Sequence, residues 1–328
     1  MKIIGLLLLM SNFAYSFPFF ALVLSAASGI SFLPYIYEPI KCTFGECCSK
    51  ALHFNSESKL AVLIFYSRLH ALWSTHFLSL HGFTGIGKNY AKTILASNLY
   101  VRGEKSKFYH FFDATVDFLF KDSVDFYKHQ VITTIKEKVQ QCPYSMFVFD
   151  EVHKMPPGIL DALVPFLGHT ESIGGVDYRK AIYIFIGNSG GLHINDYVLK
   201  TIESGKNRVS IQYTDLRNEL VKAIYSSEGG LGLSDLFSKH LITAVIPFLP
   251  LQEIHIRSCI KYLAKYLGVE ATEEMISFVL SELDWEPEGT RLFSTSGCKL
   301  VYDKIAFFLQ MRSDLIDFTD PKNIHGEL

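Results

Sequence analysis

The chain has 328 residues, a formal net charge of -2 and a hydrophobic fraction of 49%. This length is enough for two domains with a sizeable core, and the hydrophobic fraction excludes a disordered chain. The nearly neutral charge provides no broad basic surface for phosphates, so we expect no nucleic acid as a partner.

The N-terminus has the order of a secretory signal peptide. Lys2 precedes the apolar run 3–10, and Ala14-Tyr15-Ser16 follows as a cleavage site of the small-x-small type. We therefore predict a signal peptide over residues 1–16, which directs the rest of the chain into a lumen or out of the cell.

A second apolar stretch, residues 17–33, follows at once and is marginal in length for a helix that spans a bilayer. Two interpretations remain open. Either the signal is cleaved and the second stretch lies on the membrane surface, or residues 3–33 stay together as an uncleaved anchor. We favour the first, because polar residues and the cleavage site interrupt the run. Residues 17–48 are then a membrane-associated segment with a cysteine-containing link.

Six cysteines are informative in an oxidising compartment, where an even set can form disulfides. They are Cys42, Cys47, Cys48, Cys142, Cys259 and Cys298. The sequence alone does not choose among the many pairings that six cysteines allow. The close spacing of the first three suggests a metal site, but no matching Cys/His pair follows at zinc spacing, so disulfides are the favoured interpretation.

Three apolar runs, 77–80, 146–149 and 182–186, each end in a glycine-rich loop or in polar residues. Buried parallel strands have this pattern because helices cover both faces of their sheet. Long helical patterns separate the runs, which predicts right-handed βαβ connections and an α/β fold with a parallel sheet. Residues 49–77 hold a helix-like apolar run without a turn signal, and no pattern explains them.

Two prolines in "VIPFLPL" mark a second boundary. Amphipathic helices are predicted after it, over 251–268 and 271–283, with Gly268 as a stop signal. A loop and a final helix follow. We therefore predict a large nucleotide-binding domain over 49–250 and a small helical domain with a C-terminal tail over 251–328.

The loop after the first apolar run reads "LHGFTGIGKNYAK" and meets the phosphate-loop pattern at Gly82, Gly87 and Lys88, except that Asn89 replaces the usual Ser or Thr. Backbone N–H groups of such a loop point at phosphate oxygens, and the lysine neutralises the β- and γ-phosphates. A glycine-rich turn without a ligand is the alternative. The candidate nucleotide-binding residues are Gly82, Phe83, Thr84, Gly85, Ile86, Gly87, Lys88 and Asn89.

The other two apolar runs end in residues that suit phosphate chemistry. Asp150 can hold Mg²⁺, and Glu151 can polarise a water for attack on the γ-phosphate. Asn188 can orient the same water, and Lys299 can reach the nucleotide from the small domain. Each alone is compatible with an ordinary turn or surface residue, but together they are the arrangement that an AAA+ ATPase needs.

The motifs "GFTGIGKN", "MFVFDEVHKMPPGILDALVPFL", "IFIGNSGG", "VIPFLPL" and "GCKLVYDKI" resemble the torsin family of endoplasmic-reticulum AAA+ ATPases. The resemblance implies an AAA+ P-loop large domain with a small helical domain, and ATP with Mg²⁺ as the ligands. Gly-Lys-Asn is typical of torsins, so Asn89 is a family variant whose amide oxygen can reach Mg²⁺ beside Asp150. It also implies that Glu151 is catalytic, that Asn188 is sensor 1 and that Lys299 is sensor 2.

Two disulfides follow from the same resemblance. Cys298, before the sensor-2 lysine, is expected to pair with Cys259, either as a redox-controlled switch or as a plain structural bond. Cys42 is expected to pair with Cys142.

Torsins lack the arginine finger of most AAA+ rings, so the resemblance implies an outside activator. This is the luminal domain of a transmembrane protein of the lamina-associated-polypeptide type, which donates the arginine. We interpret Arg208, after sensor 1, as a surface residue. Further partners are the membrane surface, through residues 17–33, and a homo- or hetero-oligomer. The location implied is the endoplasmic-reticulum lumen, with the nuclear-envelope lumen as an option, and the terminal "HGEL" is close to a retrieval signal.

The function expected from this resemblance is activator-dependent ATP hydrolysis that remodels protein or membrane complexes. The alternative is a nucleotide-binding scaffold without hydrolysis, which the atypical segment 49–77 favours and the Asp150-Glu151 pair opposes.

Overall fold

The computed structural model describes residues 76–311, except 168–171, 228, 233, 240 and 243. The predicted signal peptide, the membrane-associated segment and the terminal HGEL lie outside the described residues. The chain divides into two compact units. Among the described residues, His76–Gly82 and Lys88–Leu249 form the first, whereas Phe83–Gly87 and Pro250–Met311 form the second. None of the described helices has the length and apolar character needed to cross a bilayer.

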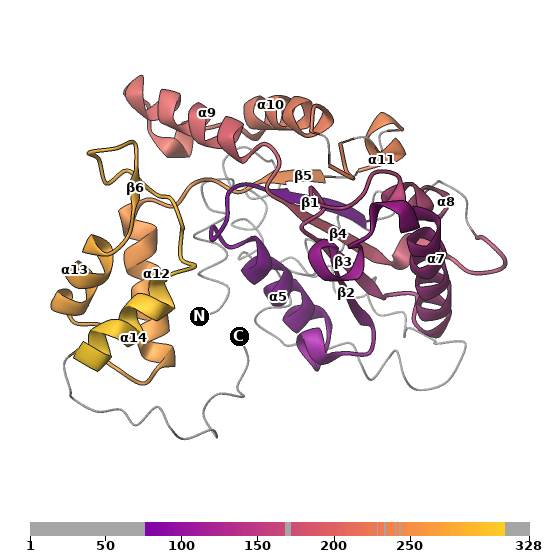
Figure 1. Ribbon diagram of the computed structural model, residues 1–328, viewed down its shortest axis with the longest axis horizontal. Helices are drawn as coiled ribbons and strands as arrows, with labels where there is room; N and C mark the ends of the chain where they lie inside the picture. Colours follow the sequence, from indigo (N-terminus) through magenta and orange to yellow (C-terminus); the bar gives the residue numbers. More distant parts are fainter. Residues whose placement is uncertain are drawn as a thin grey trace, which may run out of the picture. The chain divides into compact units, whose positions relative to one another are not determined.

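The first unit is built on a five-stranded sheet in the order β2-β3-β4-β1-β5, with all neighbouring strands parallel (Figure 1). The strands are β1 (His76–His81), β2 (Tyr109–Asp113), β3 (Met146–Asp150), β4 (Ile182–Gly187) and β5 (Ala244–Pro247). The predicted parallel sheet is confirmed. Because β1, β3 and β4 are central, their carboxyl ends lie side by side at one edge of the sheet, where ligands bind in open α/β sheets.

Strands β2 and β5 were not predicted from the sequence. Both are edge strands and are only partly buried, whereas β3 and β4 are buried along their whole length. β2 carries a histidine and an aspartate among its apolar residues, and β5 is a short Ala-Val-Ile run whose proline was interpreted only as a domain boundary.

Stacked aromatic rings cross the sheet from β2 to β1. Phe112 stacks on Phe149 at 4.9 Å between ring centroids, Phe149 on Phe185 at 5.5 Å, and Phe185 on Phe77 at 5.6 Å. Phe112, Phe149 and Phe185 share one register, so their rings are about one strand spacing apart, whereas Phe77 lies two residues before the register partner of Phe185. The row packs tightly. It forms part of a core that holds the central strands, and hence the loops after them, in place.

Helices connect these strands. They are α5 (Lys88–Leu99), α6 (Ala114–Asp117), α7 (Val124–Gln141), α8 (Val164–Leu167), α9 (Gly191–Glu203), α10 (Tyr213–Tyr225) and α11 (Asp235–Ser238), with 3₁₀ turns at Gly103–Lys105, Lys121–Ser123, Ile159–Leu163, Tyr178–Lys180 and Arg208–Ser210. Right-handed connections place α5 on one face of the sheet, and α7 and α10 on the other, because β1 to β2 crosses the sheet in the opposite direction from the later connections. Figure 1 shows α10 beside β5, where the hydroxyl of Tyr213 donates to the carbonyl of Val245.

The second unit is mainly helical, as predicted. It contains α12 (Glu253–Tyr266), α13 (Glu273–Ser281) and α14 (Val301–Met311), together with a two-stranded antiparallel sheet of β6 (Trp285–Glu286) and β7 (Phe293–Ser294). Gly268 has a φ of 73° just after α12, and its N–H donates to the carbonyl of Lys265. The predicted stop signal therefore acts as a left-handed cap.

Candidate functional site

The glycine-rich loop lies between the end of β1 and the start of α5. Gly82, Gly85 and Gly87 have φ values of 144°, 69° and 99°, a region that side chains disfavour, so glycine is needed at these positions. The helix begins at Lys88, and the N–H groups and partial positive charge of a helix start suit an anion. The loop therefore has the backbone of a phosphate-binding turn.

Lys88 links the loop to the end of β4. Its side chain is buried, and Nζ donates to the carbonyl of Gly82 at 2.7 Å and to Oδ1 of Asn188 at 2.9 Å. Burial lowers the pKa of Lys88 to about 8, while Asp150 and Glu151 oppose that shift. Two residues 100 positions apart meet because β1 and β4 are neighbours.

Asp150 ends β3 as a buried carboxylate. It accepts a hydrogen bond from the N–H of Glu151 at 2.8 Å and another from the side chain of Asn89. Burial raises the pKa of Asp150, and these two hydrogen bonds oppose that rise. The two residues predicted to hold Mg²⁺ are thus in direct contact.

Glu151 has a φ of 55°, which is unusual for a residue with a side chain and is typical of strain at functional sites. The turn is held by the N–H of Val152, which donates to the carbonyl of Ile186, and by the N–H of Lys154, which donates to the carbonyl of Glu151. Nζ of Lys154 lies 2.8 Å from Oε2 of Glu151. Glu151, the predicted base, therefore lies in a turn that is hydrogen-bonded to β4, and Lys154 is its ion-pair partner.

Phe83–Gly87, the tip of the loop, belongs to the second unit. The carbonyl of Gly85 accepts a hydrogen bond from the N–H of Cys298 at 2.9 Å. A side chain at Gly85 would overlap the carbonyl of Ser296, so this approach of two backbones also requires glycine. Lys299 follows in the same turn, exposed, with its N–H donating to Ser296. Its contact with nucleotide stays a prediction.

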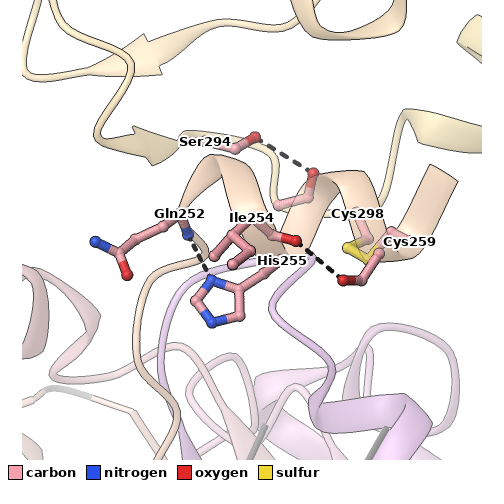
Figure 2. Close-up of a disulfide and its surroundings, with 8 residues drawn as sticks. Gln252, Ile254, His255, Cys259, Ser294 and Cys298 are labelled. Atoms are coloured by element: carbon pink, nitrogen blue, oxygen red, sulfur yellow. Dashed lines mark hydrogen bonds between the residues drawn. A yellow bond between two sulfur atoms is a disulfide. The ribbon is translucent and has the colours of Figure 1, made fainter. Parts of the chain in front are cut away.

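A disulfide joins Cys259 in α12 to Cys298 in the turn before α14 (Figure 2). Figure 2 also shows Nδ1 of His255 accepting from the N–H of Gln252 at the start of the helix, a bond of 3.1 Å. Cys298 is thus covalently fixed while its N–H contacts the loop. Cys142 is fully buried, but Cys42 lies outside the described residues, so that pair stays a prediction.

Two family models match the chain. The Torsin model matches residues 69–149, and the model for the C-terminal domain of Torsin-1A matches residues 251–308. A torsin-like protein of Caenorhabditis elegans is 35% identical over 286 residues, which is 80% of this chain and 80% of that protein. The chain belongs to the torsin family. The predicted resemblance is confirmed, and with it the AAA+ ATPase class.

Solved structures of Hsp104 also match this torsin. One is a closed state with ATPγS and FITC-casein, and another is the Saccharomyces cerevisiae Hsp104–ADP complex. Each is 16% identical with a TM-score of 0.49, and the match covers 77% of this torsin and 43% of the Hsp104 chain. At this level of similarity nothing about the chemistry of the torsin follows.

The structure corrects one expectation and adds two residues. Arg208 is not a surface residue: it is buried, and burial lowers its pKa to about 10. His81 and His153 contact the candidate site but were not predicted, although His153 lies within the motif that contains Glu151. A lone histidine gives no pattern, so only the contacts reveal these two.

Proposed function

We propose that this torsin binds Mg-ATP and hydrolyses it when an activator supplies an arginine. The observation that carries the proposal is the meeting of Lys88 with Asn188, and of Asn89 with Asp150, at the carboxyl ends of neighbouring strands. Membership of an AAA+ ATPase family supports it. A loop that served only as a turn would have no need of this set of polar groups.

The residues suggest how the site would act. The loop N–H groups and Lys88 would hold the β- and γ-phosphates. Asn89 and Asp150 offer an amide oxygen and a carboxylate, donors that Mg²⁺ prefers, so the pair fits that ion. When bound, Mg²⁺ would neutralise charge on the phosphate oxygens. Glu151 would accept a proton from the attacking water, and Asn188 would orient that water or the γ-phosphate.

The activator and the location are parts of the same proposal. The activator would be the luminal domain of a transmembrane protein, and an added arginine is worth about 10³–10⁵ in rate. The location would be the lumen of the endoplasmic reticulum or nuclear envelope, with residues 17–33 on the membrane. The work done would be remodelling of protein or membrane complexes. The family membership is what supports these points.

The test is ATP hydrolysis by the full chain with and without the activator's luminal domain, together with ATP binding. Strong stimulation would support the proposal. Bound ATP without turnover in either condition would favour the scaffold. No ATP binding would contradict both.

The scaffold remains the second candidate for one reason. Nζ of Lys154 lies 2.8 Å from Oε2 of Glu151, and this ion pair can hold the carboxylate away from the attacking water. If this contact persisted with nucleotide, hydrolysis would be slow. Lys154→Gln would then raise turnover, whereas in the ATPase it leaves the activated rate within about threefold.

A further inference from the structure

Two histidine rings flank the turn that follows β4. Nδ1 of His81 lies 3.2 Å from the carbonyl of Ser189, and Nδ1 of His153 lies 3.3 Å from the backbone nitrogen of Asn188. A Cβ on Gly187 would come within 3.8 Å of both rings, at Cε1 of His81 and Nδ1 of His153. The turn that carries Asn188 is therefore held from β1 and from the turn after β3.

The partners assign the tautomer of each ring. The carbonyl of Ser189 can only accept, so His81 carries its proton on Nδ1, and its Nε2 accepts from the hydroxyl of Ser79 at 2.6 Å. The N–H of Asn188 can only donate, so Nδ1 of His153 is unprotonated and the proton of the neutral ring is on Nε2. Burial lowers the pKa of both histidines, which keeps the rings neutral.

The protonated nitrogen of His153 faces the predicted base. Nε2 lies 3.5 Å from Oε2 of Glu151, and the ring is half-buried. One imidazole therefore contacts both the carboxylate of Glu151 and the backbone of Asn188. Packing fixes the backbone of His153 as well, because a side chain on Gly229 would overlap its carbonyl and Cα.

We propose that His153 is a positioning residue. Its ring holds the carboxylate of Glu151 and the backbone of Asn188 together, and so sets the distance between that carboxylate and the side-chain amide of Asn188. The inference rests on the proposed ATPase function. Asn188 also accepts from Lys88, so the ring connects the base, the sensor and the phosphate lysine through one chain of contacts. Removing it would misplace groups that act on the water but would leave the phosphate loop intact.

The test is the activator-stimulated turnover and the ATP Kd of the full chain carrying His153→Ala. We expect turnover to fall about 10- to 100-fold, since small misplacements at a reacting centre have effects of this size. The Kd should stay within about threefold. His153→Asn keeps an acceptor near the position of Nδ1 and should recover part of the rate, and His129→Asn, on the exposed surface of α7, is the control that should change nothing.

The outcomes separate the inference from the function on which it rests. Stimulated turnover in the wild type with an equal rate in His153→Ala would overturn the inference alone. A loss of ATP binding or of thermal stability that matches the loss of rate would also overturn it, because the role would be structural. No turnover in the wild type would overturn the proposed function and the inference together.

A double mutant tests whether His153 acts through the catalytic groups or only through the stability of the fold. In the Glu151→Gln background, adding His153→Ala should lower turnover much less than it does in the wild type, because one of the two groups that His153 positions is already inactive. Independent effects that multiply would contradict the proposal.

Discussion

Lys88 is a charged side chain that the protein buries, and its pKa of about 8 reflects the cost of that burial. A bound triphosphate would bring negative charge into contact with Nζ and raise the pKa. Binding should then take up a proton where the free site is deprotonated, which is above about pH 8.

Calorimetry can measure this linkage. At pH 8.5, the binding enthalpy should vary with the ionisation enthalpy of the buffer and show uptake of part of a proton, and at pH 6.5 it should not. Affinity for ATP should fall as the pH rises from 8 to 9.5. Lys88→Ala should abolish both the uptake and most of the binding, and a Kd equal to that of the wild type would mean that the loop is only a turn.

Glu151 is the second residue with a sharp test. Glu151→Gln keeps the size of the side chain but cannot accept the proton of water, so ATP binding should persist while turnover falls about 10²- to 10⁴-fold. The variant should also trap the complex with the activator. Glu137→Gln, an exposed carboxylate of α7, is the matched control. Unchanged hydrolysis in Glu151→Gln would refute the catalytic assignment.

The motifs predicted the candidate residues of the first unit because each follows an apolar run, at the edge where a parallel sheet binds its ligands. The contacts among them, such as Lys88 with Asn188, were not in the sequence. They depend on which strands are neighbours, and the same applies to His81 and His153.

The loop between β1 and α5 has a constraint of its own. Gly85→Ala would force a side chain into a φ of 69° and against the carbonyl of Ser296. We expect a loss of about 2 kcal/mol or more in the free energy of unfolding, with weaker ATP binding. Gly205→Ala is the control, because that glycine has a φ of 77° but nothing within 4 Å of the added Cβ. Equal effects of the two changes in urea unfolding would show that the approach to Ser296 is unimportant.

The disulfide between α12 and the turn before α14 has two candidate roles. Cys259 and Cys298 are 39 positions apart, so their bond should contribute about 3–4 kcal/mol to stability in a chain-entropy estimate. Because the N–H of Cys298 donates to Gly85, reduction should also change the ATP Kd if the bond is a switch. Identical affinities of the oxidised protein, the reduced protein and Cys259→Ser would leave the bond purely structural.

At the level of elements, the central strands and the helices of the second unit were predictable from the sequence. A strand that is buried on both faces is apolar along its length, and a helix that is buried on one face has apolar residues at helical spacing. The edge strands β2 and β5 and the pair β6 and β7 were not. β2 and β5 are partly exposed, and β6 and β7 have two residues each, which is too few for a period to show.

For the whole molecule, buried histidines predict sensitivity to acid. The pKa of His81 is lowered to about 3 and that of His110 to about 4, in both cases mainly by burial, against about 6.5 for an exposed ring. Below pH 6.5 the unfolded chain therefore binds more protons than the folded chain. The stability contributed by the neutral rings is complete above pH 6.5 and is lost progressively as the pH falls toward 3.

Urea unfolding between pH 4 and 7.5 would measure this loss. His81 alone should contribute a slope of about 1.4 kcal/mol per pH unit near pH 5. His81→Asn can keep hydrogen-bonding groups near Ser79 and Ser189 but cannot be protonated, so its curve should be flatter by that amount. Parallel curves for the two proteins would contradict the assignment.

The sequence by itself determined the class of this protein: the parallel α/β sheet, the mainly helical second unit and the torsin family. It also supplied the candidate residues for the chemistry, which stay predictions. These follow from local pattern, because burial sets the period of apolar residues and phosphate chemistry requires particular groups after particular strands. Only the tertiary structure decided which groups meet. Lys88 contacts Asn188 because β1 and β4 are neighbours, and His153 contacts the backbone of Asn188 because the turn after β3 lies beside the end of β4. Which strands are neighbours in a sheet depends on the packing of the whole core, so strand order cannot be predicted from a local stretch of sequence.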